Sequence, residues 1–200
     1  MGYHESLTEG RNAVLEAFRS GKTVDRLFVL DGCQDGPVKT ILREAKKQDT
    51  MVQYVKKERL DQLSETKNHQ GVIAYCAACE YAEVSDILEN AKKKGEAPFI
   101  VLLDGIEDPH NLGAIIRTAN QAGAHGVIIP KRRAVGLTAT VARTSAGAVN
   151  YTPVAKVTNL VTVMEDLKKE GMWFVCADMD GEEMYSLNLK GPIGLVIGNE

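Results

Sequence analysis

The stretch FIVLLDGIEDPHNLGAIIR, residues 99–117, decides the fold of this chain. Its first five residues are an apolar run typical of a buried strand, and the polar residues Asp104–His110 follow as a loop. We expect a helix to begin at Asn111, a good N-cap, and to end at Gly123, so that Arg117 lies in its second turn. The apolar face of this helix would contain Leu112, Ile115, Ile116, Ala119 and Ala122.

Further apolar runs follow, separated by Gly-rich turns and helices, at Gly126–Ile129, Val149–Val154, Met172–Ala177 and Ile193–Ile197. Apolar strands that alternate with helices indicate a parallel sheet covered on both faces. Residues 98–200 are therefore predicted to form a doubly wound α/β domain, whose ligands collect at the carboxyl ends of the strands. The first loop lacks G-x-G-x-x-G and G-x-x-x-x-G-K patterns, which disfavours nucleotide binding of the dehydrogenase or P-loop type.

The first 75 residues predict a small αβαβαβ domain of their own. Its helices are expected at Glu9–Ser20, Val38–Gln48 and Lys57–Glu65, and its strands at Val24–Leu30, Met51–Val55 and Val72–Cys76. Residues 76–97 are expected to be a linker with one helix, Val84–Lys94.

The composition of the chain argues against some classes of function but does not identify its function. No apolar run is long enough to span a membrane, and the start of the chain does not resemble a signal peptide, so we expect a cytoplasmic protein. Cys76 and Cys79 form a C-x-x-C without a second pair, which argues against a zinc site. The net charge is −3, with 12 Lys+Arg against 11 Asp+Glu in residues 1–75 and 12 against 16 afterwards. Charge alone leaves RNA binding open.

Two short motifs are more specific. Asn111, Gly113 and Arg117 have the spacing N-x-G-x-x-x-R, and residues 191–200 read GPIGLVIGNE. Both resemble signatures of the SpoU (TrmH) branch of the SPOUT methyltransferases, in the same order along the chain. Residues 9–17 (EGRNAVLEA), 24–29 (VDRLFV) and 69–72 (HQGV) resemble the N-terminal substrate-binding domain of members that methylate a guanosine of 23S rRNA.

The resemblance implies a function and a set of site residues. Members transfer a methyl group from S-adenosyl-L-methionine to a ribose 2′-hydroxyl of ribosomal RNA, act as homodimers, and close a C-terminal trefoil knot around the cofactor. It assigns catalysis to Arg117, Asn111 and Glu200, and cofactor binding to Ala177, Gly198 and Ser145. No metal is required. Since a guanidinium is a poor base, Arg117 is expected to orient the hydroxyl and its phosphate.

Four of these six residues also have an ordinary structural explanation. Arg117 fits the solvated side of an amphipathic helix, and Asn111 fits a helix N-cap. Ala177 and Gly198 fit tight turns after strands. The basic cluster Lys131, Arg132 and Arg133 fits either a contact with RNA phosphates or a solvated loop.

The chain departs from the family pattern after Glu200, where a third signature with Ser-Leu-Asn is expected. We therefore expect the methyltransferase domain to be C-terminally incomplete here, with weaker cofactor binding than a complete protein. Two rival functions remain open at this point. One is a non-catalytic RNA-binding or ribosome-assembly protein on the same scaffold, and the other is a generic nucleotide-dependent α/β enzyme.

Overall fold

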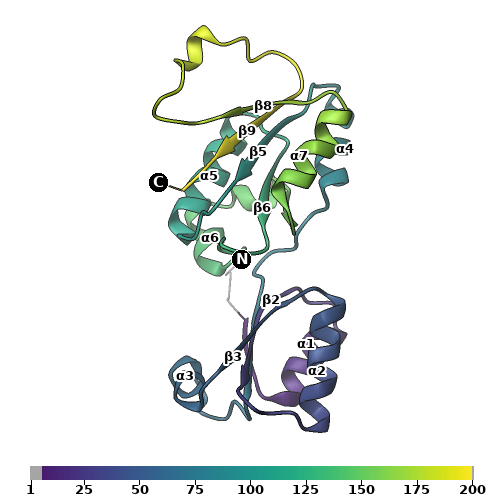
Figure 1. The fold of residues 1–200 in the computed structure, drawn as a ribbon, viewed down its shortest axis with the longest axis vertical. Helices are drawn as coiled ribbons and strands as arrows, with labels where there is room; N and C mark the ends of the chain where they lie inside the picture. Colours follow the sequence, from purple (N-terminus) through teal and green to yellow (C-terminus); the bar gives the residue numbers. More distant parts are fainter. Residues whose placement is uncertain (1–5, 200) are drawn as a thin grey trace. The chain divides into compact units, whose positions relative to one another are not determined.

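The structure, a computed structural model, describes residues 6–199, and these divide into two units. The first contains residues 6–80 with 136–139, and the second contains 81–135 and 140–199. Each unit is built around its own sheet (Figure 1). Within residues 6–199 no helix is both long enough and apolar enough to cross a membrane.

The first unit is a mixed sheet of four strands in the order β1-β4-β2-β3. Its elements are β1 (Ser6–Glu9), α1 (Arg11–Arg19), β2 (Val24–Leu30), α2 (Gly36–Lys47), β3 (Met51–Val55), α3 (Lys57–Leu63) and β4 (Val72–Cys76). Helices α1 and α2 cover one face of the sheet and α3 covers the other. The larger core includes the fully buried Val14, Leu27 and Ile41.

The second unit is a parallel sheet of five strands in the order β7-β6-β5-β9-β8. Its elements are α4 (Val84–Lys94), β5 (Phe99–Leu103), α5 (Pro109–Gln121), β6 (Gly126–Pro130), α6 (Ala139–Thr144), a 3-10 turn η1 (Ala148–Asn150), β7 (Val154–Val157), α7 (Leu160–Lys169), β8 (Trp173–Cys176), a 3-10 turn η2 (Met184–Ser186) and β9 (Ile193–Ile197). Helices α4 and α7 lie on one face and α5 on the other (Figure 1). The predicted α/β class with a parallel sheet is confirmed.

Two of the predicted elements begin at other residues than expected. The helix expected from Glu9 begins at Arg11, because Glu9 ends a strand and Gly10 turns the chain with φ 87°. The strand expected at Val149–Val154 is a 3-10 turn followed by a strand that starts only at Val154. Val149 is buried all the same, since this turn packs against α5. Its apolar character therefore reflects burial and not strand pairing.

Candidate functional site

The carboxyl ends of the parallel strands lie at one edge of the second unit. Strand β5 is the switch point of the sheet, because the strands that follow it in the chain lie first on one side of it and then on the other. From β5 the chain continues to β6 and β7 on one side, and β9 and β8 fill the other side. The backbone N–H of Asp104 donates to the carbonyl of Ile197 at 2.9 Å. A Cβ placed on Gly105 would lie 3.2 Å from the Cβ of Asn199. The loop after β5 and the residues after β9 are thus side by side at a switch point, where open α/β sheets bind their ligands.

Two of the residues predicted to bind the cofactor follow neighbouring strands at this edge. Ala177 comes directly after β8, and its N–H donates to the carbonyl of Val196 at 2.9 Å. Gly198 comes directly after β9, and a Cβ placed on it would meet nothing within 4 Å. Both are exposed, so small residues leave the backbone open to a ligand at two adjacent strand ends. Glu200, predicted to be catalytic, lies outside the described residues.

Helix α5 begins earlier than its sequence pattern suggested. Its N-cap is Asp108, whose carboxylate accepts the backbone N–H of His110 at 2.8 Å, and Pro109 is the first helical residue. Proline suits that position because it has no N–H to leave unpaired and its φ is already helical. The interpretation of Asn111 as the N-cap was therefore wrong. Asn111 is exposed in the first turn, and Arg117 lies in the third turn instead of the second.

Arg117 is exposed on α5 and forms no hydrogen bond or ion pair with any residue from 6 to 199. It stands four positions after Gly113, one turn further along the same side of the helix. A guanidinium without an intramolecular partner keeps all its donors for a ligand. This geometry agrees with the proposed role of Arg117 and equally with a solvated helix face.

Close packing of α5 against α6 explains why residue 113 is a glycine. A Cβ at this position would lie 2.7 Å from the Cβ of Thr144 and 3.0 Å from both the backbone nitrogen of Ser145 and the carbonyl oxygen of Val141. Helix α5 can approach the end of α6 this closely only where it carries a glycine. The glycine of the N-x-G-x-x-x-R spacing thus fixes how α5 lies against residues 141–145.

Ser145 lies inside this contact. Its side chain is fully buried, and its hydroxyl donates to the carbonyl of Ala142 at 2.9 Å. The chain then turns through Ala146 and Gly147, which both have positive φ values. The structure therefore does not bring the Ser145 side chain to the exposed edge with Ala177 and Gly198.

The basic cluster Lys131, Arg132 and Arg133 follows β6, whose carboxyl end belongs to the same edge of the sheet. The backbone N–H of Lys131 donates to the carbonyl of Val157 at the end of β7. The side chains of Arg132 and Arg133 are exposed. Cations at the ligand edge are suited to neutralising phosphates.

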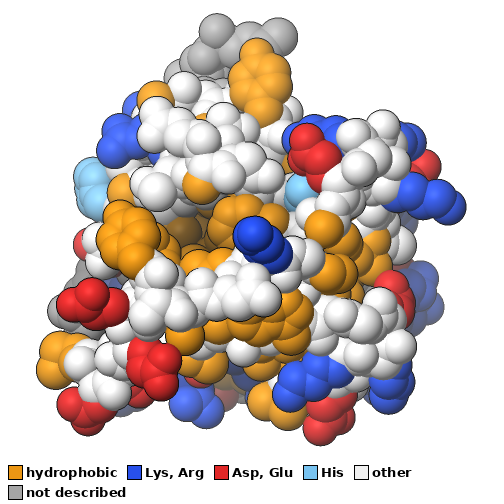
Figure 2. Space-filling view, turned by 90° about the horizontal axis from the view of Figure 1, so that it is seen from above, with side chains coloured by type: hydrophobic (Ala, Val, Ile, Leu, Met, Phe, Trp, Pro, Cys, Tyr) orange, Lys and Arg blue, Asp and Glu red, His pale blue; other side chains and the backbone are white. Residues whose placement is uncertain are grey.

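The segment between β8 and β9 carries exposed apolar side chains. Met179, Met184 and Tyr185 are 99%, 57% and 92% exposed. This segment forms the yellow loop at the top of Figure 1, and Figure 2 looks at the molecule from that side. Hydrophobic side chains gather there around a hollow, with charged side chains mostly toward the rim.

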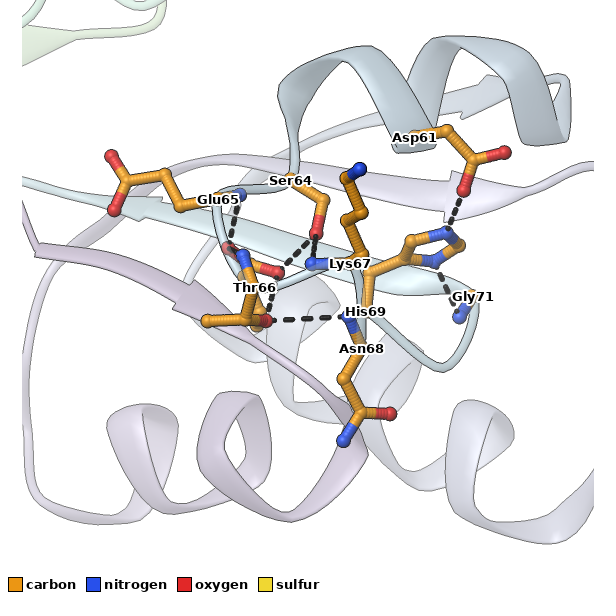
Figure 3. A network of polar contacts seen from close by, with 9 residues as sticks. Asp61, Ser64, Glu65, Thr66, Lys67, Asn68, His69 and Gly71 are labelled. Carbon is orange, nitrogen blue, oxygen red and sulfur yellow. Dashed lines mark hydrogen bonds and ion pairs between the residues drawn. The ribbon is translucent and has the colours of Figure 1, made fainter.

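The first unit contains a polar network that sequence reasoning missed (Figure 3). The Glu9 carboxylate accepts hydrogen bonds from the hydroxyls of Ser64 and Thr66 and from the backbone N–H groups of Glu65 and Thr66. One side chain at the end of β1 thus holds the loop after α3. The only signal of this network in the sequence was Glu9 itself, a glutamate directly before Gly10, the glycine that connects β1 to α1.

His69 lies near the C-terminal end of the same loop and holds it through hydrogen bonds. Its side chain is buried, with only 7% exposed. Its Nδ1 accepts the backbone N–H of Gly71 at 3.0 Å, so the proton of a neutral ring is on Nε2. Nε2 then donates to Asp61 at 3.0 Å. His69 and Glu9 together fix the path of residues 64–71.

The Glu9 network predicts a pH-dependent contribution to stability. Partial burial acts to raise the pKa of Glu9, but the hydrogen bonds from Ser64, Thr66 and the two backbone amides outweigh it and hold the pKa below the ordinary value of 4.5. A carboxylate with a lowered pKa stabilises the fold above its ordinary pKa, and the effect is lost as the pH falls through the folded value.

We expect Glu9→Gln to lower the free energy of unfolding by about 1–2 kcal/mol at neutral pH, because an amide cannot accept all four donors. The gap between the two proteins should shrink as the pH falls to about 3. Urea unfolding followed by circular dichroism at both pH values measures it. A gap of the same size at both would contradict the ionised-carboxylate explanation.

Comparisons with known proteins agree with this architecture. The sequence profile of the SpoU rRNA Methylase family matches residues 98–200, and that of RNA 2′-O ribose methyltransferase substrate binding matches residues 7–82. YacO of Bacillus subtilis, assigned to the TrmH family of tRNA/rRNA methyltransferases, is 47% identical over 193 residues, covering 96% of this chain and 77% of the relative. A relative of Staphylococcus haemolyticus with the same assignment is 44% identical over 192 residues, with the same coverage of each chain.

Solved structures share the fold. An rRNA methyltransferase from Sinorhizobium meliloti has a TM-score of 0.51 at 26% identity, covering 97% of this chain and 71% of that one. The SpoU methyltransferase AviRb from Streptomyces viridochromogenes, solved in complex with the cofactor AdoMet, has a TM-score of 0.54 at 24% identity, covering 98% and 73%. Fold and ligand edge define an α/β RNA methyltransferase of the SPOUT class. The chain belongs to the SpoU rRNA methylase family.

Proposed function

We propose that this protein transfers a methyl group from S-adenosyl-L-methionine to a ribose 2′-hydroxyl of ribosomal RNA, and that its target is a guanosine of 23S rRNA. The observation that carries the proposal is the ligand edge at the switch point between β5 and β9, combined with a substrate-binding profile over residues 7–82. That profile describes substrate binding by RNA 2′-O ribose methyltransferases.

The residues at the edge fit the cofactor by their size and exposure. S-adenosylmethionine supplies the methyl group when it is bound. Gly198 has open space where a side chain would stand, and Ala177 adds only a methyl group at the next strand end. Their backbone groups would hold the adenosine portion. Ser145 would act through the position of its backbone, since its hydroxyl is already used by Ala142.

The reaction at the ribose requires an oriented hydroxyl, an acceptor for its proton and a sulfonium in line with its oxygen, so that the S–CH3 bond breaks and the thioether leaves as the O–CH3 bond forms. Arg117 would donate to the 2′-oxygen or to the adjacent phosphate and so hold the ribose in line. Arg132 and Arg133 would neutralise phosphates at the same edge. Asn111, one residue beyond the exposed His110, would contact the RNA at the start of α5.

We also propose that residues 1–75 bind RNA and that residues 98–200 carry the transfer site. The stretch 76–97, expected to be a linker, contains α4, whose Ile87 lies in the core of the second unit. The two matching profiles, over 7–82 and 98–200, support an N-terminal RNA-binding part and a C-terminal transferase part.

The proposed substrate is tested by transfer of a radioactive methyl group from S-adenosylmethionine to unmodified 23S rRNA and to unmodified tRNA. We expect label in 23S rRNA only, recovered after nuclease digestion as 2′-O-methylguanosine. Label in tRNA would contradict the rRNA assignment, and label on a base would contradict the ribose assignment.

A further inference from the structure

We infer that a groove in the first unit, beside the Glu9 network, holds an unpaired nucleobase of the RNA. The groove has a volume of about 430 Å³, in the range of sites that hold small organic molecules. It is lined by Leu7, Glu9, Gly10, Asn12, Ala13, Glu65, Thr66, Asn68 and Gln70. The inference rests on the proposed function, since it takes RNA as the substrate.

The walls of the groove are held in place. One wall is the first turn of α1, which Gly10 introduces with φ 87°. The other is the loop 64–70, fixed by the hydrogen bonds of Glu9 and His69 (Figure 3). Gln70 joins the walls, because its side-chain oxygen accepts the backbone N–H of Arg11 at 3.3 Å. A site held in this way does not need to form when the ligand arrives.

Charge argues against a phosphate in this groove. Glu9 and Glu65 line it, and no lysine or arginine does. Arg11 is next to it, but its guanidinium is engaged with Asp35 at 2.6 Å and with the backbone carbonyl of Gln70. The start of α1 contributes roughly half a positive charge, which does not balance two carboxylates. An uncharged ligand is therefore favoured.

The remaining polar groups match the edge of a base. The side-chain amides of Asn12 and Asn68 form no hydrogen bond with any residue in the described range 6–199. The side-chain nitrogen of Gln70 likewise has no partner there. An amide offers a donor and an acceptor side by side, which is the arrangement that pairs with a nucleobase edge. Leu7 and Ala13 add an apolar surface for the ring.

The test uses the whole chain and a fluorescein-labelled RNA hairpin whose unpaired loop has a randomised sequence. A second hairpin has the same backbone with abasic loop nucleotides. We expect Asn12→Ala combined with Asn68→Ala to weaken binding of the intact hairpin at least about tenfold, with an unchanged salt slope. Binding of the abasic hairpin should be the same for both proteins.

Gln34→Ala is the matched control. It removes an exposed amide of the same unit outside the groove, and this variant should bind both hairpins as the wild type does.

Equal affinity of wild type and double variant for the intact hairpin would overturn the inference. An equal loss on the abasic hairpin would overturn it in favour of backbone contacts. If the wild type binds neither hairpin, RNA binding itself fails and the inference falls with it. A protein that shows the expected binding pattern but transfers no methyl group would overturn the proposed function alone.

Discussion

Replacing Arg117 with alanine is expected to reduce methyl transfer to rRNA at least about 100-fold while leaving the fold intact. A donor placed where the reacting oxygen is held contributes on the order of 10²–10³ in rate. Arg117 is exposed and has no partner within residues 6–199, so its truncation should change the free energy of unfolding by less than about 0.5 kcal/mol. Single-turnover methyl transfer and thermal unfolding measure the two quantities.

Two further variants sharpen this test. Lys92→Ala removes an exposed cation from α4 in the same unit and should retain wild-type transfer. Arg117→Lys keeps the charge but loses the planar fork, so it should recover only a small part of the rate. Wild-type transfer by Arg117→Ala would assign this side chain to the solvated helix face.

Gly113→Ala is expected to destabilise the second unit, although alanine favours helices. The new Cβ would stand 2.7 Å from the Cβ of Thr144 and 3.0 Å from backbone atoms that cannot rotate away. Overpacking of this kind costs about 1–3 kcal/mol, against a gain in helix propensity of at most about 1 kcal/mol. The net loss should lower the melting temperature by about 2–8 °C and displace α5 with Arg117.

Gly36→Ala is the matched control for this prediction. Gly36 is the first residue of α2, and a Cβ placed on it would meet nothing within 4 Å. The same chemical change there should leave the melting temperature unchanged or slightly raised. Differential scanning calorimetry compares the two variants. A melting temperature of Gly113→Ala at or above that of wild type would show that α5 can move away at no cost.

Much of the fold could be predicted because its strands are short apolar runs bounded by turn residues. The strands at Phe99–Leu103 and Ile193–Ile197 and the helix at Val84–Lys94 have the predicted bounds. Strand β1 could not be found, since its four residues SLTE become a strand only by pairing with β4 across almost 70 positions of sequence. Such pairing depends on tertiary structure and not on local preference.

The candidate site was predictable in its place but not in all its details. Parallel strands put the ends of β5, β8 and β9 at one edge, and the structure confirms this placement of Ala177 and Gly198. The burial of Ser145 could not be foreseen, because it follows from how closely Gly113 lets α5 approach. The roles of these residues, the trefoil knot and the homodimer stay predictions.

The position of β9 has a consequence for synthesis on the ribosome. β9 lies between β5 and β8 in the sheet. One side of β5 and both sides of β8 therefore have no strand to pair with until residues 193–197 have been synthesised. The 94 residues from Asp104 to Ile197 take about 5–20 s to translate at roughly 5–20 residues per second. During that interval the apolar edge FIVLL has no partner on this side, and an open apolar edge invites pairing with other chains. We therefore expect the β9 side of β5 to stay open to pairing with other chains until residues 193–197 have been synthesised.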